Sequence, residues 1–222
     1  MSRRVLNSLV AIVVLALGAS AWAADKAKDE ETLRNANTVL HAMLDGNSIP
    51  PDLLAKADCV VVLPGVKKFG FGVGGSGGRG PLLCKTKSGA WSAPAMYTIG
   101  GVSAGFQVGG SSTDFVLVVM TQKGMDALMN GKMKLGNEAT ATAGPSGATA
   151  ADVGGDIYTY GRAKGLFAGV SLGGATLEFD KDANTRLYGA DATDDTIVIK
   201  NSVKTPEAGK PLVSLLNSKS KK

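Results

Sequence analysis

His41 is the only histidine in the chain, so any catalysis that needs an imidazole would have to use it. A triad of serine, histidine and aspartate is one possibility, since the imidazole takes the proton of the attacking hydroxyl. His41, however, follows Leu40 in a helical pattern, where a position on the helix surface is expected. The sequence therefore predicts a protein that is not an enzyme, and a hydrolase that uses His41 is the weaker alternative.

Metal and nucleotide sites have little support in the sequence. One histidine and two separated cysteines do not supply the four ligands of a structural zinc site. The acidic cluster at residues 191–195 lacks the spacing of a calcium-binding EF-hand loop, and we expect a solvated loop there. Gly72, Gly74 and Gly77 match G-x-G-x-x-G, but a strand is predicted to follow where a dinucleotide site needs a helix. We expect no metal, no cofactor and no nucleic-acid partner.

Cys59 and Cys84 are the only cysteines, and they fall on neighbouring predicted strands. In an exported protein an even number of cysteines favours a disulfide. The alternative is that both are small buried hydrophobic side chains, which free cysteine resembles. Either role is structural rather than catalytic.

Basic and aromatic residues stand together near the first predicted turn. Lys67 and Lys68 directly precede Phe69 and Phe71. Three more basic residues lie on the next hairpin, where they could project to the same edge: Arg79, Lys85 and Lys87. Lysines attract anionic head groups by up to about 1 kcal/mol each, and neighbouring aromatic groups can enter the interface. This combination suits lipid binding, and the alternative is a solvated edge whose lysines prevent pairing with other chains.

A glycine-rich pattern occurs three times, at residues 70–75, 105–110 and 169–174. Each copy reads glycine, a hydrophobic residue, any residue, Val or Leu, and a glycine pair. The alternation has the period of a strand, yet glycine occupies sites where a strand normally carries side chains. The pattern predicts three equivalent strands that are sharply curved or closely packed.

Helical periodicity at the two ends of the chain surrounds strand periodicity in the middle. Helices are predicted at 29–45, directly after Ser48, at 122–130 and at 206–217. Strands are predicted at 59–63, 69–74, 81–86, 90–92, 96–99, 103–108, 115–121, 157–160 and 166–178, with a turn at Pro64 and Gly65. The fold class is α+β: a mainly antiparallel, glycine-rich curved sheet or barrel-like β-domain framed by N-terminal and C-terminal helices.

The first 23 residues have the organisation of a signal peptide. Arg3 and Arg4 precede an apolar run at 10–17, and Ala21, Trp22 and Ala23 form an A-x-A cleavage site. The apolar run is shorter than the roughly 20 residues of a membrane-spanning helix. Cleavage after Ala23 would leave residues 24–222 as one domain and lower the net charge from +5 to +3. We expect export to a bacterial periplasm, where disulfides form.

The chain resembles the SYLF lipid-binding domain family, in the form that bacteria export. The resemblance is carried by Leu-Pro-Gly-Val at 63–66, Lys68, Gly-Phe-Gly-Val-Gly-Gly at 70–75, Gly-Arg-Gly at 78–80, Trp-Ser-Ala-Pro at 91–94, Gly-Phe-Gln-Val-Gly at 105–109, Gly-Leu-Phe-Ala-Gly-Val-Ser-Leu at 165–172 and Tyr-Gly at 188–189. These stretches extend over nearly all of residues 24–222.

The resemblance implies a non-enzymatic domain that associates with membranes. Eukaryotic members bind phosphoinositides and some bind actin, whereas exported bacterial members are thought to bind phospholipid at the cell envelope. The first helix here carries Asp29, Glu30 and Glu31 rather than a strongly basic face. We therefore expect general anionic phospholipid as the partner, at a periplasmic position peripheral to the outer or inner membrane, and we do not expect actin. A structural or protein-interaction component of the envelope is the alternative.

Overall fold

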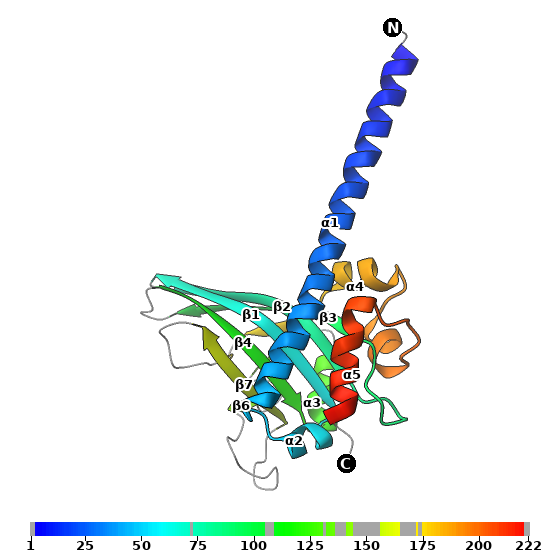
Figure 1. Cartoon of the computed structure of the whole chain (residues 1–222). Helices are drawn as coiled ribbons and strands as arrows, with labels where there is room; N and C mark the ends of the chain where they lie inside the picture. The colour runs from blue at the N-terminus through cyan, green and yellow to red at the C-terminus, as the bar shows by residue number, and fades with distance from the viewer. Residues whose placement is uncertain are drawn as a thin grey trace.

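The computed structural model contains a curved sheet with helices on both of its faces (Figure 1). It describes residues 3–71, 73–104, 109–130, 132–135, 141–143, 156–164, 172 and 175–219. Within these ranges, side chains are described except at 3–21, 51, 70–71, 73, 103–104, 109, 132, 141–143 and 163–164.

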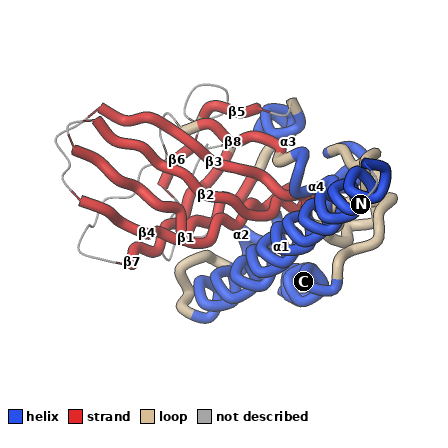
Figure 2. The backbone as a smooth tube through the Cα atoms, turned by 90° about the horizontal axis from the view of Figure 1, so that it is seen from above, coloured by secondary structure: helices blue, strands red, loops and turns tan. Residues whose placement is uncertain are grey.

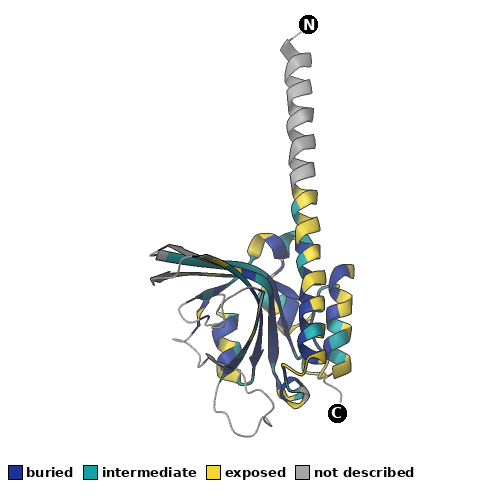
Figure 3. Cartoon of the chain, turned by 60° about the vertical axis from the view of Figure 1, so that its left-hand side comes forward, coloured by how far each residue is buried: buried dark blue, intermediate teal, exposed yellow. Residues whose placement is uncertain are grey.

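The sheet has eight strands within the described residues, in the order β5-β8-β3-β2-β1-β4-β7-β6. The strands are β1 (Cys59–Phe71), β2 (Val73–Cys84), β3 (Ala95–Ala104), β4 (Gly109–Val119), β5 (Lys132–Lys134), β6 (Ala141–Ala143), β7 (Ile157–Lys164) and β8 (Thr176–Phe179). All neighbours are antiparallel except the short pair of β6 and β7. The sheet curls into a half-barrel (Figure 3).

Helices cover both faces of the sheet. They are α1 (Arg3–Asp45), α2 (Pro51–Lys56), α3 (Gln122–Met129), α4 (Lys181–Tyr188), a π-helix η1 (Asp195–Ile199), a 3-10 helix η2 (Glu207–Gly209) and α5 (Lys210–Lys219). We call the face that packs on α1, α2 and α5 the α1 face, and the face that packs on α3 and η1 the α3 face. The predicted α+β class, with a mainly antiparallel curved sheet and helices at both ends of the chain, is confirmed.

The core lies on both sides of the central strands. Val60 and Val62 of β1 belong to the cluster under α1, while Val61 and Leu63 belong to the cluster under α3. This alternation follows from the two-residue period of a strand. A strand buried on both faces carries consecutive apolar residues, which is why Cys59 to Leu63 was readable from sequence.

The predicted turn at Pro64 and Gly65 is wrong, because β1 continues through both residues. A bulge in the pairing with β4 lies between Leu63 and Val66, and Gly65 has a φ of +59°, which glycine adopts readily. The Gly65 amide donates to Asp114 Oδ1 at 2.9 Å, which satisfies the bulged backbone. The bulge keeps Val66 in the cluster of the α3 face, so Lys67 lies on the α1 face.

The expectation of three equivalent glycine-rich strands is wrong for the first copy. Residues 70–75 form the end of β1 and the start of β2, with Gly70 paired to Gly74 around the hairpin. The second copy lies partly outside the described residues, at 105–108, before Gly109 and Gly110 open β4. Only Leu172 of the third copy lies inside them.

Other elements also differ from the sequence prediction. Residues 90–92 are not a strand, and only Trp91 makes a bridge, to Lys85. The long strand predicted at 166–178 corresponds to the short β8, and its residues 166–171, 173 and 174 lie outside the described part of the chain. Helix α4 and the π-helix η1 were not predicted.

Candidate lipid-contact surface

Among the described residues, no helix covers the α1 face toward the β1–β2 hairpin. Figure 2 shows strands β1 to β4 running beyond the edge of α1, and Figure 3 shows the change from buried to intermediate along the same strands. This uncovered part, which we call the sheet tip, is rich in glycine: Gly75, Gly77, Gly100 and Gly110 lie on its α1 face. Because glycine has no side chain, the backbone of the sheet tip is accessible between the few side chains on this face.

Two apolar side chains stand on the sheet tip in one transverse row. Phe69 on β1 pairs with Gly75 on β2, which in turn pairs with Val102 on β3. Directly paired residues point to the same face, so these three positions and Gly110 on β4 form what we call the apolar row. Phe69 is 67% exposed and Val102 is 83% exposed. Exposed large apolar groups that share one face in this way are typical of a contact surface.

The ring of Phe69 lies across the neighbouring strand. A β-carbon added to Gly75 would meet the tip of that ring at 2.9 Å. The glycine thus provides the space in which the ring rests on the backbone of β2. The opposite side of the ring stays open to solvent, as the large exposed fraction of Phe69 shows.

A second row, two residues farther from the hairpin, carries lysines. Lys67 pairs with Gly77 on one side and with Ser112 on the other. The row continues from Gly77 through Gly100 and Thr176 to Lys134. Lys67 and Lys134 are both exposed, and we call this set the lysine row. The two lysines are four strands apart, which is roughly 19 Å along the sheet.

Lys68 does not share this surface, because strand alternation places it on the α3 face. Its Nζ lies 5.8 Å from the centroid of the Phe115 ring, a cation-π contact. Burial lowers the pKa of Lys68. The side chain of Phe71, the other aromatic residue predicted for this surface, lies outside the described part of the structure.

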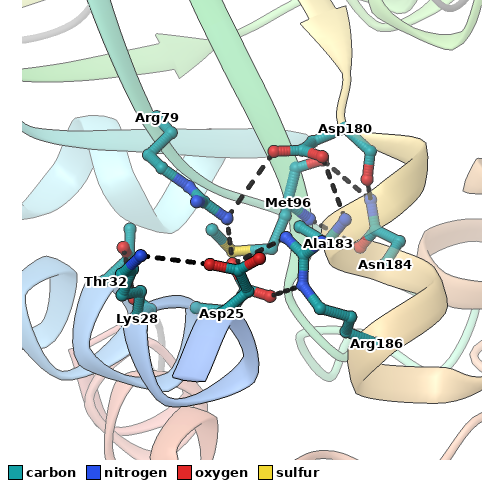
Figure 4. Close-up of polar contacts among 10 residues, drawn as sticks. Asp25, Lys28, Thr32, Arg79, Met96, Asp180, Ala183, Asn184 and Arg186 are labelled. Carbon is teal, nitrogen blue, oxygen red and sulfur yellow. Dashed lines mark hydrogen bonds and ion pairs between the residues drawn. The ribbon is translucent and has the colours of Figure 1, made fainter. Parts of the chain in front are cut away.

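Arg79 was predicted as a lipid contact, but the structure places it in a buried ion-pair network. Its guanidinium contacts the carboxylate of Asp29 on α1, which is fully buried, and lies 3.6 Å from Asp180. Arg186 on α4 donates to the same Asp29 carboxylate from Nε at 2.6 Å. Figure 4 shows Arg79 and Arg186 on opposite sides of this group of polar contacts. Through Asp29 these ion pairs connect α1 to β2 and α4, so Arg79 has a structural role.

Lys85 and Lys87 lie at the other end of β2, so the expectation that they share an edge with Lys67 is wrong. Along the strand, Cys84 is about 36 Å from Val73. The Lys85 ammonium donates to the carbonyl of Ala55 at 2.5 Å and lies 5.5 Å from the Trp91 ring centroid. Desolvation lowers the pKa of Lys85. Lys87 is exposed in the turn that follows.

Cys59 and Cys84 are joined by a disulfide in the structure. They are directly paired residues of β1 and β2, and both are fully buried on the α3 face at the end of the sheet remote from the tip. The bond crosslinks two neighbouring strands of the core and leaves the sheet tip without a covalent constraint among the described residues.

No catalytic triad is assembled in the described part of the chain. His41 is exposed on α1, and its Nδ1 lies 2.7 Å from Asp45 one turn later. The sequence contains a G-x-S-x-G pattern centred on Ser76, but Ser76 lies within strand β2, paired with Lys68 and Gly101. A nucleophile elbow requires a turn from strand to helix. The described residues also contain no group of three or more potential metal ligands.

Asp191 and Asp195 are exposed, as expected for a solvated acidic segment, but Asp194 departs from that expectation. It is half-buried, and its Oδ1 accepts a hydrogen bond from the Tyr97 hydroxyl at 2.6 Å. Burial raises the pKa of Asp194 to about 6, against the opposing effect of the Tyr97 bond. Sequence reasoning missed this contact because the apolar residues that anchor the segment, Ile197 and Val198, follow the acidic cluster.

The chain is similar in sequence to several known proteins. Residues 100–219 match the family described as Ysc84, Las17-binding protein actin regulator. The SH3 domain-containing protein PJ696.02 of Schizosaccharomyces pombe is 37% identical over 179 residues, which cover 77% of this chain and 41% of that protein. LAS seventeen-binding protein 3 of Saccharomyces cerevisiae is 34% identical over 179 residues, 77% of this chain and 39% of that protein.

A vertebrate relative gives a similar result. SH3 domain-containing YSC84-like protein 1 of Xenopus laevis is 34% identical over 176 residues, 77% of this chain and 52% of that protein. The chain thus matches about two fifths to a half of the length of these relatives. No solved structure matches. Among the described residues, no helix has both the length and the apolar character to cross a bilayer.

Proposed function

The chain belongs to the Ysc84 family, and from that premise we propose that it is a non-enzymatic protein that binds anionic phospholipid at a membrane surface. The family description and the name of LAS seventeen-binding protein 3 describe binding or regulation. None of the relatives' names describes an enzyme. The family description names Las17 and actin as targets. Because we also propose export of this chain, those cytoskeletal targets are not part of the proposal.

One observation carries the lipid proposal: an exposed aromatic ring and an exposed lysine share one uncovered face. Phe69 and Lys67 are two residues apart on β1, so they lie on the same side about 7 Å apart along the strand. Aromatic side chains are favoured at the level of lipid head groups, and lysine attracts anionic lipid. The contact residues proposed are therefore Lys67, Phe69, Val102 and Lys134, in place of the wider set predicted from sequence.

Export is proposed from the arrangement of residues 1–23. The pattern of Arg3, Arg4, an apolar run and the small residues before Ala24 is that of a cleaved leader. Supporting this, residues 22–24 are exposed, and the first buried residue of α1 among those described is Asp29. Cleavage after Ala23 would therefore remove no described buried contact. Mass spectrometry of the chain recovered from a bacterial periplasm should give an N-terminus at Ala24, and a retained leader would contradict the proposal.

Vesicle flotation tests the lipid function. The chain beginning at Ala24 should float with vesicles in proportion to their phosphatidylglycerol content and should not float with pure phosphatidylcholine. Binding should weaken with salt, because the Debye length falls from ~10 Å at 0.1 M to ~3 Å at 1 M. Absence of flotation at every lipid composition would reject the lipid function and favour a protein-interaction role in the envelope.

A further inference from the structure

We propose that the sheet tip enters a bilayer with the apolar row in the interface and the lysine row at the level of the phosphates. Resting on the lipid function proposed above, this inference identifies the ligand as a bilayer surface rather than one lipid molecule held in a pocket. It also fixes an orientation, with the β1–β2 hairpin toward the membrane and the Cys59–Cys84 end away from it.

The order of the two rows along the strands supports this orientation. The apolar row, with Phe69 and Val102, lies nearer the hairpin than the lysine row, with Lys67 and Lys134. The two rows are two residues apart, about 7 Å. Lysine side chains are long enough to reach the head groups while neighbouring apolar groups lie deeper. Farther from the hairpin, Arg79 is paired with Asp29, so its charge is directed toward α1.

The spacing within the lysine row indicates a surface rather than a single head group. Lys67 and Lys134 are separated by four strands, roughly 19 Å, and the positions between them carry only glycine or threonine. A β-carbon on Gly77 would meet nothing within 4 Å, and one on Gly100 would meet only a backbone oxygen at 3.9 Å. Because these two glycines carry no side chain, several head groups can approach the strand backbone between the lysines.

Depth-dependent quenching provides the test. In the chain from Ala24, tryptophan replaces Phe69, Val102 or, as the matched control, Lys87, which is exposed at the opposite end of β2. Vesicles contain phosphatidylglycerol and a brominated phosphatidylcholine. The native Trp91 is 2% exposed and provides the background in all three variants. Phe69→Trp and Val102→Trp should lose at least half of their added fluorescence, whereas Lys87→Trp should lose less than a tenth.

Three outcomes would overturn the inference. Vesicle binding with equal quenching at positions 69 and 87 would reject the orientation while leaving the lipid function in place. Saturable binding of monomeric dihexanoyl phosphatidylglycerol, as tight as binding to vesicles, would show a single-lipid site. A blue shift of Phe69→Trp that depends on protein concentration and occurs without vesicles would show that a second copy of the chain covers the tip. Failure of all variants to bind vesicles would instead reject the lipid function itself.

Discussion

A β-carbon added to Gly80 would lie 1.9 Å from the carbonyl oxygen of Val62 on the neighbouring strand. The pairing of β1 with β2 shifts register between Val61 and Lys67, and Gly80 lies beside this irregularity. The close approach of two backbones there leaves no space for any side chain. Glycine at this position is therefore a requirement of the bend that directs β1 toward the sheet tip.

We expect Gly80→Ala to destabilise the fold by about 3 kcal/mol or more, because one of the two strand backbones must move. Gly77→Ala is the matched control, since its β-carbon would meet no atom within 4 Å. That change should alter stability by less than about 1 kcal/mol. Urea unfolding of both variants measures the difference, and equal losses would show that the backbone contact at Gly80 does not determine stability.

The buried carboxylate of Asp29 supports a second prediction. Removing it would leave Arg79 and Arg186 together without their shared partner. Breaking a buried ion pair by deleting one partner costs about 3–5 kcal/mol, so Asp29→Asn should lower the free energy of unfolding by that order. Glu31→Gln, at an exposed position two residues later, should change it by less than about 0.5 kcal/mol. Similar melting temperatures for the two variants would contradict the role of the network.

Burial of the Asp194 carboxyl makes stability depend on pH. Burial raises the pKa of Asp194 from 3.8 to about 6 in the folded state, so the folded chain binds this proton more readily than the unfolded chain. Between pH 6 and pH 4 the contribution of Asp194 to stability should therefore increase as pH falls. Tyr97 stays protonated throughout, since burial raises its pKa above the usual value.

Asp194→Asn removes this titration while keeping an oxygen that can accept from Tyr97. The difference in unfolding free energy between wild type and Asp194→Asn should shift in favour of wild type as pH is lowered from 7 to 4. Denaturant unfolding at several pH values measures that difference. A difference that stays constant, or that shifts toward the variant at low pH, would contradict burial of the Asp194 carboxyl.

The disulfide gives a prediction that uses no variant. The cysteines are 25 residues apart in sequence, and closing a loop of that length should stabilise the fold by about 3 kcal/mol in the chain-entropy model. The chain unfolded without reductant should show no reactive thiol, and reduction should lower its melting temperature. Two reactive thiols in the unreduced protein would show that Cys59 and Cys84 are free.

The elements were readable from sequence where local periodicity and burial agree. The helical spacing of Leu33, Ala36 and Leu40 placed the packed part of α1, and the apolar run from Cys59 placed the first half of β1. The bend at Pro64 and Gly65 was read as a turn because both residues favour turns locally. The hydrogen bond from Gly65 to Asp114, 49 residues away, keeps the strand continuous. Local propensity contains no information about such a distant partner.

The candidate surface was predicted only in part, because some of its residues are neighbours in sequence and others meet only in the folded sheet. Lys67 and Phe69 are neighbours along one strand, so their proximity follows from the sequence itself. Val102 and Lys134 join them only through the register of five strands, which residue spacing does not give. Arg79 has the positive charge that a lipid contact needs, but it donates to the carboxylate of Asp29, 50 residues earlier in the chain. Whether a basic residue faces solvent or a buried partner depends on tertiary contacts.

The central claim is tested most directly by reversing one charge on the sheet tip and the same charge at the far end. Lys67→Glu and Lys87→Glu change the same residue type at two exposed positions, with circular dichroism as the control for folding. Reversal at the tip should remove about 2 kcal/mol of attraction to an anionic surface, which is roughly a 30-fold weaker affinity.

Co-sedimentation of both variants with phosphatidylglycerol vesicles is the decisive measurement. We expect Lys67→Glu to lose most of its vesicle binding. The vesicle affinity of Lys87→Glu should stay within about twofold of the wild-type affinity, which is a smaller change than the tenfold that about 1.4 kcal/mol represents. Equal binding by the two variants, or a larger loss for Lys87→Glu, would contradict the assignment of the sheet tip as the membrane-contact surface.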